Sequence, residues 1–167
     1  MTMERNPKEF SFLADAMLGK IARKLRIFGF DTVYDSNLDD DNILNSSNYT
    51  GRIVLTSDND LFNRCKKKRI DSILTYKETE IENLVTIFKT LNIKFINFPI
   101  VPCLCTSCNG KLDKISDNSL IKNKLSEQLL KSHEIFYRCI KCDKIYWAGS
   151  HLKRISRLIN EINSKLM

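Results

Sequence analysis

Residues 52–62, RIVLTSDNDLF, join a short apolar run to two aspartates and then to a stretch with helical spacing. The apolar run follows Gly51 and is rich in β-branched residues, which predicts a buried strand. Asp58 and Asp60 come directly after it. Carboxylates in that position lie at the carboxyl edge of a sheet, which is where open α/β folds bind ligands. Asp58 taken alone has a simpler interpretation, because aspartate is a favoured N-cap for the helix that follows a strand.

The same alternation of strand and helix extends through the first half of the chain. Apolar segments at 10–14, 30–35, 52–55 and 73–76 are each followed by a segment with helical spacing, at 17–29, 37–49, 61–68 and 80–91. Strands that alternate with helices in this way predict a parallel sheet with helices on its faces. We therefore expect an α/β fold of three layers with a mostly parallel central sheet.

Two further aspartates occupy comparable junctions between strands and helices. Asp15 follows the first predicted strand, and Asp40 opens the second predicted helix. Since the carboxyl ends of parallel strands share one edge, Asp15, Asp40 and Asp58 can meet there, with Asp60 beside them. Hard oxygen ligands suit Mg²⁺ or Mn²⁺. One or two such ions can activate water and stabilise the leaving oxygen of a phosphodiester.

The helix predicted after Asp15 carries a basic side. Lys20, Arg23 and Lys24 begin one turn beyond the aspartate. Cations beside an acidic metal site are what a phosphodiester backbone needs for positioning. A solvated helix face is the alternative interpretation of the same pattern.

The cysteines of the second half predict a metal site. Five of the six lie between positions 103 and 142. Two pairs have two-residue spacing and can present four thiolates to Zn²⁺: Cys105 with Cys108, and Cys139 with Cys142. Predicted hairpin strands at 135–138 and 145–147 flank the second pair, so we expect a structural zinc ribbon. Cys103 can replace Cys105 through a wider spacing, and this alternative stays open.

Charge is unevenly distributed along the chain. Residues 1–98 carry 15 Lys or Arg against 14 Asp or Glu, whereas residues 99–167 carry 12 against 6. A basic second half favours an anionic partner such as nucleic acid. Tyr137, Tyr146 and Trp147 are interleaved with cations, which suits stacking on bases. Packing of the small module is the alternative role for these aromatics.

Composition limits the compartment and the domain plan. No apolar run approaches the length of a membrane span, and the N-terminal MTMERNPKEF has no apolar core of a signal peptide, so we expect a cytoplasmic protein with no membrane partner. Two prolines near residue 100 indicate a boundary. We predict an α/β domain at 1–98, a ribbon at 99–151 with a helix at 118–131, and a helical tail at 152–167.

Several motifs together resemble the Mut-seven C-terminal RNase domain family, a PIN-like nuclease fold joined to a C-terminal zinc ribbon. The resemblance extends from about residue 10 to residue 151. It is carried by FLADAMLGKIARKLRIFGFDT, GRIVLTSDNDL, CTSCNGKL and RCIKCDKIYWAGSH. The combination is specific to the family, whereas the central segment by itself is similar to PIN domains in general.

The resemblance implies cleavage of RNA by clustered acids and a divalent metal. Asp15 matches the acid after the first strand, and Asp58 the acid of the central strand, with Asp60 as its companion. Asp40 fits the acid that opens the preceding helix, although its neighbours Asp39 and Asp41 are also candidates. PIN nucleases often carry one more acid in the middle of the domain, for which this sequence has no clear counterpart.

We therefore predict a metal-dependent ribonuclease in which the ribbon aids RNA binding. A non-catalytic RNA-binding or adaptor protein with a degenerate site is the main alternative. A toxin-type nuclease with a paired inhibitor is a third hypothesis, against which the added ribbon speaks.

Overall fold

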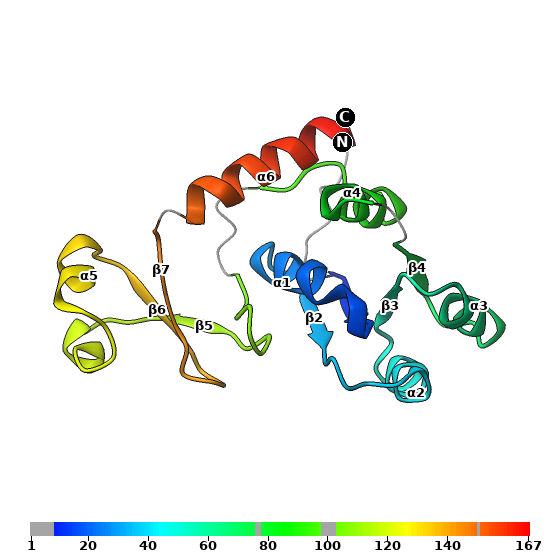
Figure 1. Cartoon of the computed structure of the whole chain (residues 1–167), viewed down its shortest axis with the longest axis horizontal. Coiled ribbons are helices and arrows are strands. Elements are labelled where there is room, and N and C mark those ends of the chain that lie inside the picture. Colours follow the sequence, from blue (N-terminus) through cyan, green and yellow to red (C-terminus); the bar gives the residue numbers. More distant parts are fainter. Residues whose placement is uncertain (1–8, 76–77, 98–102, 150) are drawn as a thin grey trace.

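A computed structural model of the chain describes residues 9–75, 78–97, 103–149 and 151–167. At its centre lies a four-stranded sheet in the order β2-β1-β3-β4, in which each neighbouring pair is parallel (Figure 1). The strands are β1 (Ser11–Ala14), β2 (Asp31–Tyr34), β3 (Ile53–Thr56) and β4 (Ser72–Leu74). This confirms the predicted α/β fold with a parallel sheet. Tyr76, the last residue of the fourth predicted strand, lies outside the described residues.

Helices cover both faces of the sheet, which gives three layers. One face carries α1 (Gly19–Ile27, after the 3₁₀ turn η2, Ala16–Leu18), α4 (Glu80–Thr90) and α6 (His151–Leu166), and the other carries α2 (Asp40–Thr50) and α3 (Asn59–Lys67). Alternate residues of β1 serve the two faces: Phe12 and Ala14 belong to the first core, and Leu13 belongs to the second. This two-residue period is the one that a strand buried on both sides requires.

Local sequence signals set the starts of the helices around the sheet edge. Asp39 caps α2 by accepting a hydrogen bond from the Asn42 amide at 2.8 Å. Thr79 and Glu82 form a reciprocal capping box at the start of α4. At the other end of α2, Gly51 takes the left-handed conformation with φ of 68° that commonly ends a helix.

The cysteine-rich segment forms a second, antiparallel sheet. Its order is β5-β6-β7, from β5 (Leu112–Lys114), β6 (Phe136–Cys139) and β7 (Ile145–Trp147). The predicted hairpin is present, whereas the prediction of one helix over 118–131 is wrong. That stretch forms a 3₁₀ turn, η3 (Asn118–Ile121), and a separate short helix, α5 (Glu127–Ser132). The reason is local, because the Ser126 side chain accepts from the Leu129 amide and starts a new helix.

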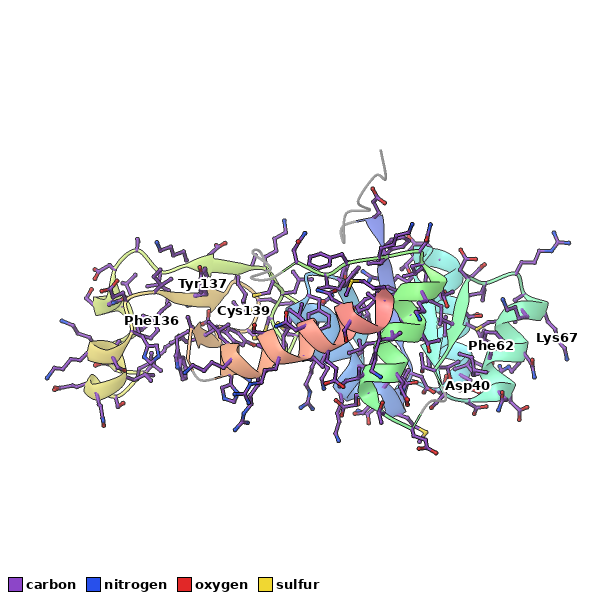
Figure 2. The ribbon with its side chains drawn as sticks, turned by 90° about the horizontal axis from the view of Figure 1, so that it is seen from above. Asp40, Phe62, Lys67, Phe136, Tyr137 and Cys139 are labelled. Atoms are coloured by element: carbon purple, nitrogen blue, oxygen red, sulfur yellow. The ribbon has the colours of Figure 1, made fainter. Side chains whose placement is uncertain are left out.

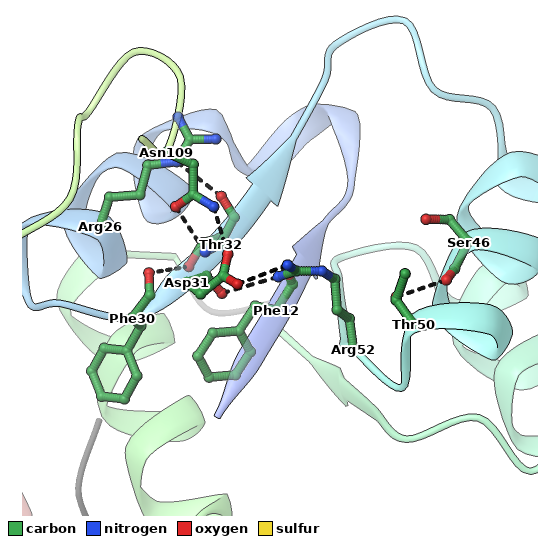
Figure 3. Close-up of polar contacts among 9 residues, drawn as sticks. All are labelled: Phe12, Arg26, Phe30, Asp31, Thr32, Ser46, Thr50, Arg52 and Asn109. Atoms are coloured by element: carbon green, nitrogen blue, oxygen red, sulfur yellow. Dashed lines mark hydrogen bonds and ion pairs between the residues drawn. The ribbon is translucent and has the colours of Figure 1, made fainter. Parts of the chain in front are cut away.

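The ribbon docks on the open edge of the first sheet through its first cysteine turn. The buried Arg26 donates to the Thr32 carbonyl at 2.9 Å, and Asn109 accepts from the Thr32 amide at 3.1 Å (Figure 3). Arg26 also donates to the Thr106 carbonyl at 2.9 Å. Asn109 also donates to the Asp31 carboxylate, which is held from the other side by Arg52 at 2.7 Å. Both backbone groups of Thr32, on an edge strand, are therefore satisfied by the ribbon and by α1.

The last helix returns from the ribbon to the first core. Helix α6 begins after β7 and ends on α4 (Figure 1). Its Ile159 and Ile162 are buried in the first core, together with residues of α1 and α4. The Asn163 amide exchanges two hydrogen bonds with the backbone of Ile96, at 2.8 and 2.9 Å. The boundary predicted between residues 98 and 99 lies outside the described residues. In the ranges that are described, no helix is long and apolar enough to cross a membrane.

Candidate functional site

One buried hydroxyl links two of the predicted acids at the carboxyl edge of the parallel sheet. Thr56, the last residue of β3, donates to Oδ2 of Asp15 at 2.8 Å. The same hydroxyl oxygen accepts the Asp58 amide at 2.9 Å. Asp15 also donates its own backbone N–H to the Leu55 carbonyl, because β1 and β3 are neighbours in the sheet. Asp15 is buried and Asp58 is exposed, so the pair stands where the core opens to solvent.

Asp58 has a capping role as well. Its Oδ1 accepts the Asp60 amide at 2.6 Å and the Leu61 amide at 3.4 Å, which starts α3. The N-cap interpretation of Asp58 is confirmed, and because the cap uses one oxygen, the other stays available for the predicted metal site. Asp60 lies exposed in the first turn of α3, next to Asp58 in space through that cap.

The three aspartates at the start of α2 are divided between two tasks. Asp39 is the N-cap, while Asp40 and Asp41 both pair with Arg64 of α3. The Arg64 Nη1 lies 3.0 Å from Oδ2 of Asp40. An arginine that bridges two carboxylates ties α2 to α3 on that face of the sheet. Asp40 therefore pairs with a cation, Arg64. It is not part of the hydrogen-bonded link that runs from Asp15 through Thr56 to Asp58.

The predicted phosphate-positioning lysines meet an acid at the start of α4. Glu80 pairs with Lys24 and with Lys20, the latter at 3.5 Å. The hydrogen bond from Lys24 lowers the pKa of Glu80, although partial burial opposes the shift. Lys20 keeps 80% of its side chain exposed, and Arg23 is exposed without an acidic partner among the described residues. This side of α1 therefore contains both free and paired cations.

The acids are suited to a hydrated ion rather than to a closed cage. Among the described residues, the four ribbon cysteines are the only group of three or more potential ligands close enough to share one ion. Within the same residues, Oδ1 of Asp15 and Oδ2 of Asp58 accept no hydrogen bond. Mg²⁺ usually keeps several waters and is held by one or two carboxylates. Asp15 and Asp58 could each offer one oxygen to such an ion, whereas Asp40 pairs with Arg64.

Four thiols converge in the ribbon. The Sγ atoms of Cys105, Cys108, Cys139 and Cys142 all lie within 4.8 Å of one another. Two of the separations are 3.6 Å (Cys105 to Cys142) and 3.4 Å (Cys108 to Cys139). A tetrahedron of Zn–S bonds of about 2.3 Å has edges of roughly 3.8 Å, so the four sulfurs could hold a metal such as zinc. Cys103 is not part of the group.

Electrostatics within the four thiols favour a bound cation. Burial raises the pKa of Cys105, but hydrogen bonds from Tyr146 and from the backbone of Cys108 and Ser107 outweigh it and lower the pKa to about 6. Burial and contacts with the neighbouring thiols raise the pKa of Cys108 to about 12. One sulfur is therefore ready to ligate at neutral pH, and the next keeps its proton until a metal compensates the charge.

The thiol group and the acidic edge are separate sites. Cys139 lies toward the ribbon end of the molecule, and Asp40 lies toward the opposite end (Figure 2). The hydroxyl of Tyr146 contacts Cys105 Sγ at 3.0 Å and Thr106 Oγ1 at 3.2 Å, so this aromatic side chain packs the thiol site. Four cysteines are enough to fill every position around a tetrahedral ion, which is the ligand set typical of structural zinc sites.

Fold and site together define a class of protein. It is a parallel α/β domain with carboxylates at the carboxyl edge of its sheet, joined to a small module with four clustered cysteines. The chain matches the model of the Mut7-C RNAse domain over residues 10–159, and it belongs to that family. Membership connects the chain to ribonuclease function and to RNA as substrate. No curated protein and no solved structure matches the chain.

Sequence reasoning missed three side chains at this edge. Glu80 stands in the first turn of α4, and the Thr79 capping box was the available signal, because it fixes where that helix begins. Arg64 had no signal beyond its place on a basic helix. Thr56 stands at the end of the predicted central strand, but its bond to Asp15 depends on two strands becoming neighbours.

Proposed function

We propose that the protein is a metal-dependent endoribonuclease that hydrolyses RNA phosphodiesters at the carboxyl edge of the parallel sheet. The observation that carries the proposal is the Asp15–Thr56–Asp58 connection, which holds two carboxylates at that edge while each keeps one oxygen free of hydrogen bonds from the described residues. Family membership supports the reaction class. The proposal assigns the nuclease to residues 1–98 together with α6, and the zinc-binding module to residues 99–151.

Each residue of the site has a role in this proposal. Asp15 and Asp58 would hold Mg²⁺ or Mn²⁺, which supplies an activated water and stabilises the leaving oxygen. Thr56 fixes the orientation of the Asp15 carboxylate by donating to one of its oxygens. Asp60 adds negative charge beside Asp58. Asp40 is the predicted catalytic acid at the start of α2, where it pairs with Arg64.

Cations on α1 would position the RNA backbone. Arg23 is exposed, and Lys20 can exchange Glu80 for a phosphate because an exposed ion pair contributes only about 0–1 kcal/mol. Lys24 is the more enclosed of the two lysines, with 25% of its side chain exposed, and it keeps Glu80 in place. We assign the four ribbon cysteines to structural Zn²⁺ and the protein to the cytoplasm, a reducing compartment in which thiols remain available for metal.

Cleavage of a labelled single-stranded RNA, with and without Mg²⁺ or Mn²⁺, tests the proposal. Asp15→Asn keeps the size of the side chain and is expected to reduce the rate at least about 100-fold, since it removes a charge that binds the ion. Asp113→Asn, at an exposed position on the ribbon, is the matched control and should cleave like the wild type. Unlike the Asp58 side chain, the Asp15 side chain makes no cap hydrogen bond to a helix, so a loss of activity will not be confused with a lost cap.

Two outcomes would contradict the proposal. One is an Asp15→Asn variant that cleaves as fast as the wild type. The other is a zinc-loaded, folded protein that binds RNA but shows no cleavage with either ion. The second outcome would favour the non-catalytic RNA-binding alternative, for which the ion pairs of Asp40 and Asp41 with Arg64 are the supporting observation.

A further inference from the structure

The outer side of α6 carries bases that have no partners among the described residues. Helix α6 holds four Lys or Arg against one Asp or Glu, and the acid comes late, at Glu161. Lys153, Arg154 and Arg157 are exposed. None of the three forms a hydrogen bond or ion pair with any described residue. Six other cations of the described chain do pair with acids: Lys20, Lys24, Arg52, Arg64, Lys131 and Arg138. Three uncompensated cations within two helical turns form a site for an anionic partner.

The inner side of α6 fixes these bases in place. Ile159 and Ile162 are buried in the first core, and Asn163 binds the backbone of Ile96 through both of its amide atoms. Lys153 and Arg157 are one turn apart, which is about 6 Å along the helix. Because Ile159 and Ile162 are already used by the core, the second half of the helix offers little apolar contact to a lipid surface.

An exposed indole precedes the basic turns of α6 in the sequence. Trp147 ends β7 with 39% of its surface exposed. The His133 and Trp147 rings form an edge-type contact, with 6.4 Å between their centroids. Two backbone hydrogen bonds lie between the indole and the helix: the Gly149 amide donates to the Trp147 carbonyl at 3.1 Å, and the Leu152 amide donates to the Gly149 carbonyl at 3.0 Å. A side chain at Gly149 would contact the indole Nε1 at 3.0 Å, so the ring lies directly over this glycine.

We infer that Trp147 and the outer side of α6, through Lys153, Arg154 and Arg157, form a docking surface for single-stranded RNA. The inference rests on the proposed function, because it names where the substrate lies outside the cleavage site. An aromatic face next to a row of cations matches the alternation of base and phosphate in an unpaired strand. A duplex hides its bases and would leave the indole unused. Since α6 spans the distance from the ribbon to α4 (Figure 1), RNA bound there would run from the zinc module toward the α/β domain.

Binding of a fluorescently labelled single-stranded RNA, measured by anisotropy without Mg²⁺ or Mn²⁺ at several salt concentrations, tests this surface. The triple variant K153Q/R154Q/R157Q should bind at least about 10-fold more weakly, and the slope of log K against log salt should fall by about 2, since each lost phosphate contact removes about 0.7. The control K66Q/K67Q/K68Q removes the same charge from the exposed end of α3 and should retain the wild-type slope. Trp147→Ala should weaken binding about 10-fold, whereas Trp147→Phe should retain most of the affinity.

Three results would overturn the inference: wild-type affinity in the α6 triple variant, equal losses in the α6 and α3 variants, or a wild-type protein that binds polyglutamate and no RNA. The third result would assign the surface to an acidic protein instead. Failure of the ribonuclease proposal is separately visible, because binding is measured without the catalytic ion. Binding that depends on α6 without any cleavage supports the surface alone, and cleavage with α6-independent binding supports only the nuclease.

Discussion

At the scale of single residues, the candidate site depends on one hydroxyl more than on any one acid. Thr56 joins Asp15 and Asp58, although Asp15 and Thr56 are 41 positions apart in the sequence. The acids could be predicted because their chemical type and their place after apolar runs are visible in the sequence. Their pairing could not, because it depends on the register of β1 against β3.

Replacing Thr56 by valine tests this role, since valine keeps the shape and the β-branch of a buried strand residue. The change leaves the Asp58 amide without its acceptor and frees the Asp15 carboxylate, so we expect a loss of about 1–3 kcal/mol in the free energy of unfolding. RNA cleavage should also fall at least about 10-fold. Thr56→Ser restores the hydroxyl and is expected to recover most of the activity. Equal cleavage rates for the valine and serine variants would argue against a positioning role.

At the scale of elements, periodicity within a segment predicted the strands and helices of the first domain, and caps such as Gly51 and Thr79 fixed their ends. Periodicity gave a wrong prediction for the segment 118–131. One helix was expected there, but Ser126 caps a separate helix, α5. The docking of the ribbon on β2 could not be predicted from the sequence either. Arg26 and Thr106 are separated by 80 positions, and an arginine on a basic helix gives no sign that it will be buried.

The contact between Asn109 and β2 can be tested with little disturbance of the backbone. Asn109 has φ of 64°, a conformation that glycine adopts without strain, so Asn109→Gly removes the side chain alone. We expect it to lower the free energy of unfolding by about 1–2 kcal/mol, because two partly buried hydrogen bonds are lost. Chemical denaturation measures the change. Asn92→Gly, at φ of 57° on an exposed turn, is the matched control and should be neutral or slightly stabilising.

At the scale of the whole molecule, the two modules are connected twice. In the first connection, the first cysteine turn forms hydrogen bonds with Arg26 of α1 and Thr32 of β2. In the second, α6 runs from the ribbon back to α4 and packs on it. The apolar stripe of the C-terminal tail predicted a helix, but its target is a core formed mainly by residues far earlier in the chain. The two sites, acidic and thiol, are therefore distant from each other yet share a structural framework.

This double connection predicts that loss of metal from the ribbon loosens the edge of the distant parallel sheet. The turn between Cys105 and Cys108 presents the carbonyls to which Arg26 donates, so the shape of the metal site and the docking contact belong to the same backbone. Cys139→Ser should abolish zinc binding, and hydrogen exchange should then accelerate about 10-fold or more at the Thr32 amide, because its acceptor on Asn109 is released.

The accelerated exchange should stop at the edge strand. Val54 lies in β3, two strands away from the docking contact, and its amide should remain protected in the zinc-free variant. Cys65→Ser changes a buried thiol of α3 that is not one of the four clustered cysteines, and it should keep about one zinc per chain and wild-type exchange at Thr32. If Thr32 stays protected while zinc is absent, the ribbon is held by α6 alone and the metal stabilises only its own module. If the Thr32 amide loses protection and the Val54 amide keeps it, the zinc site supports the structure of β2, the edge strand that pairs with β1.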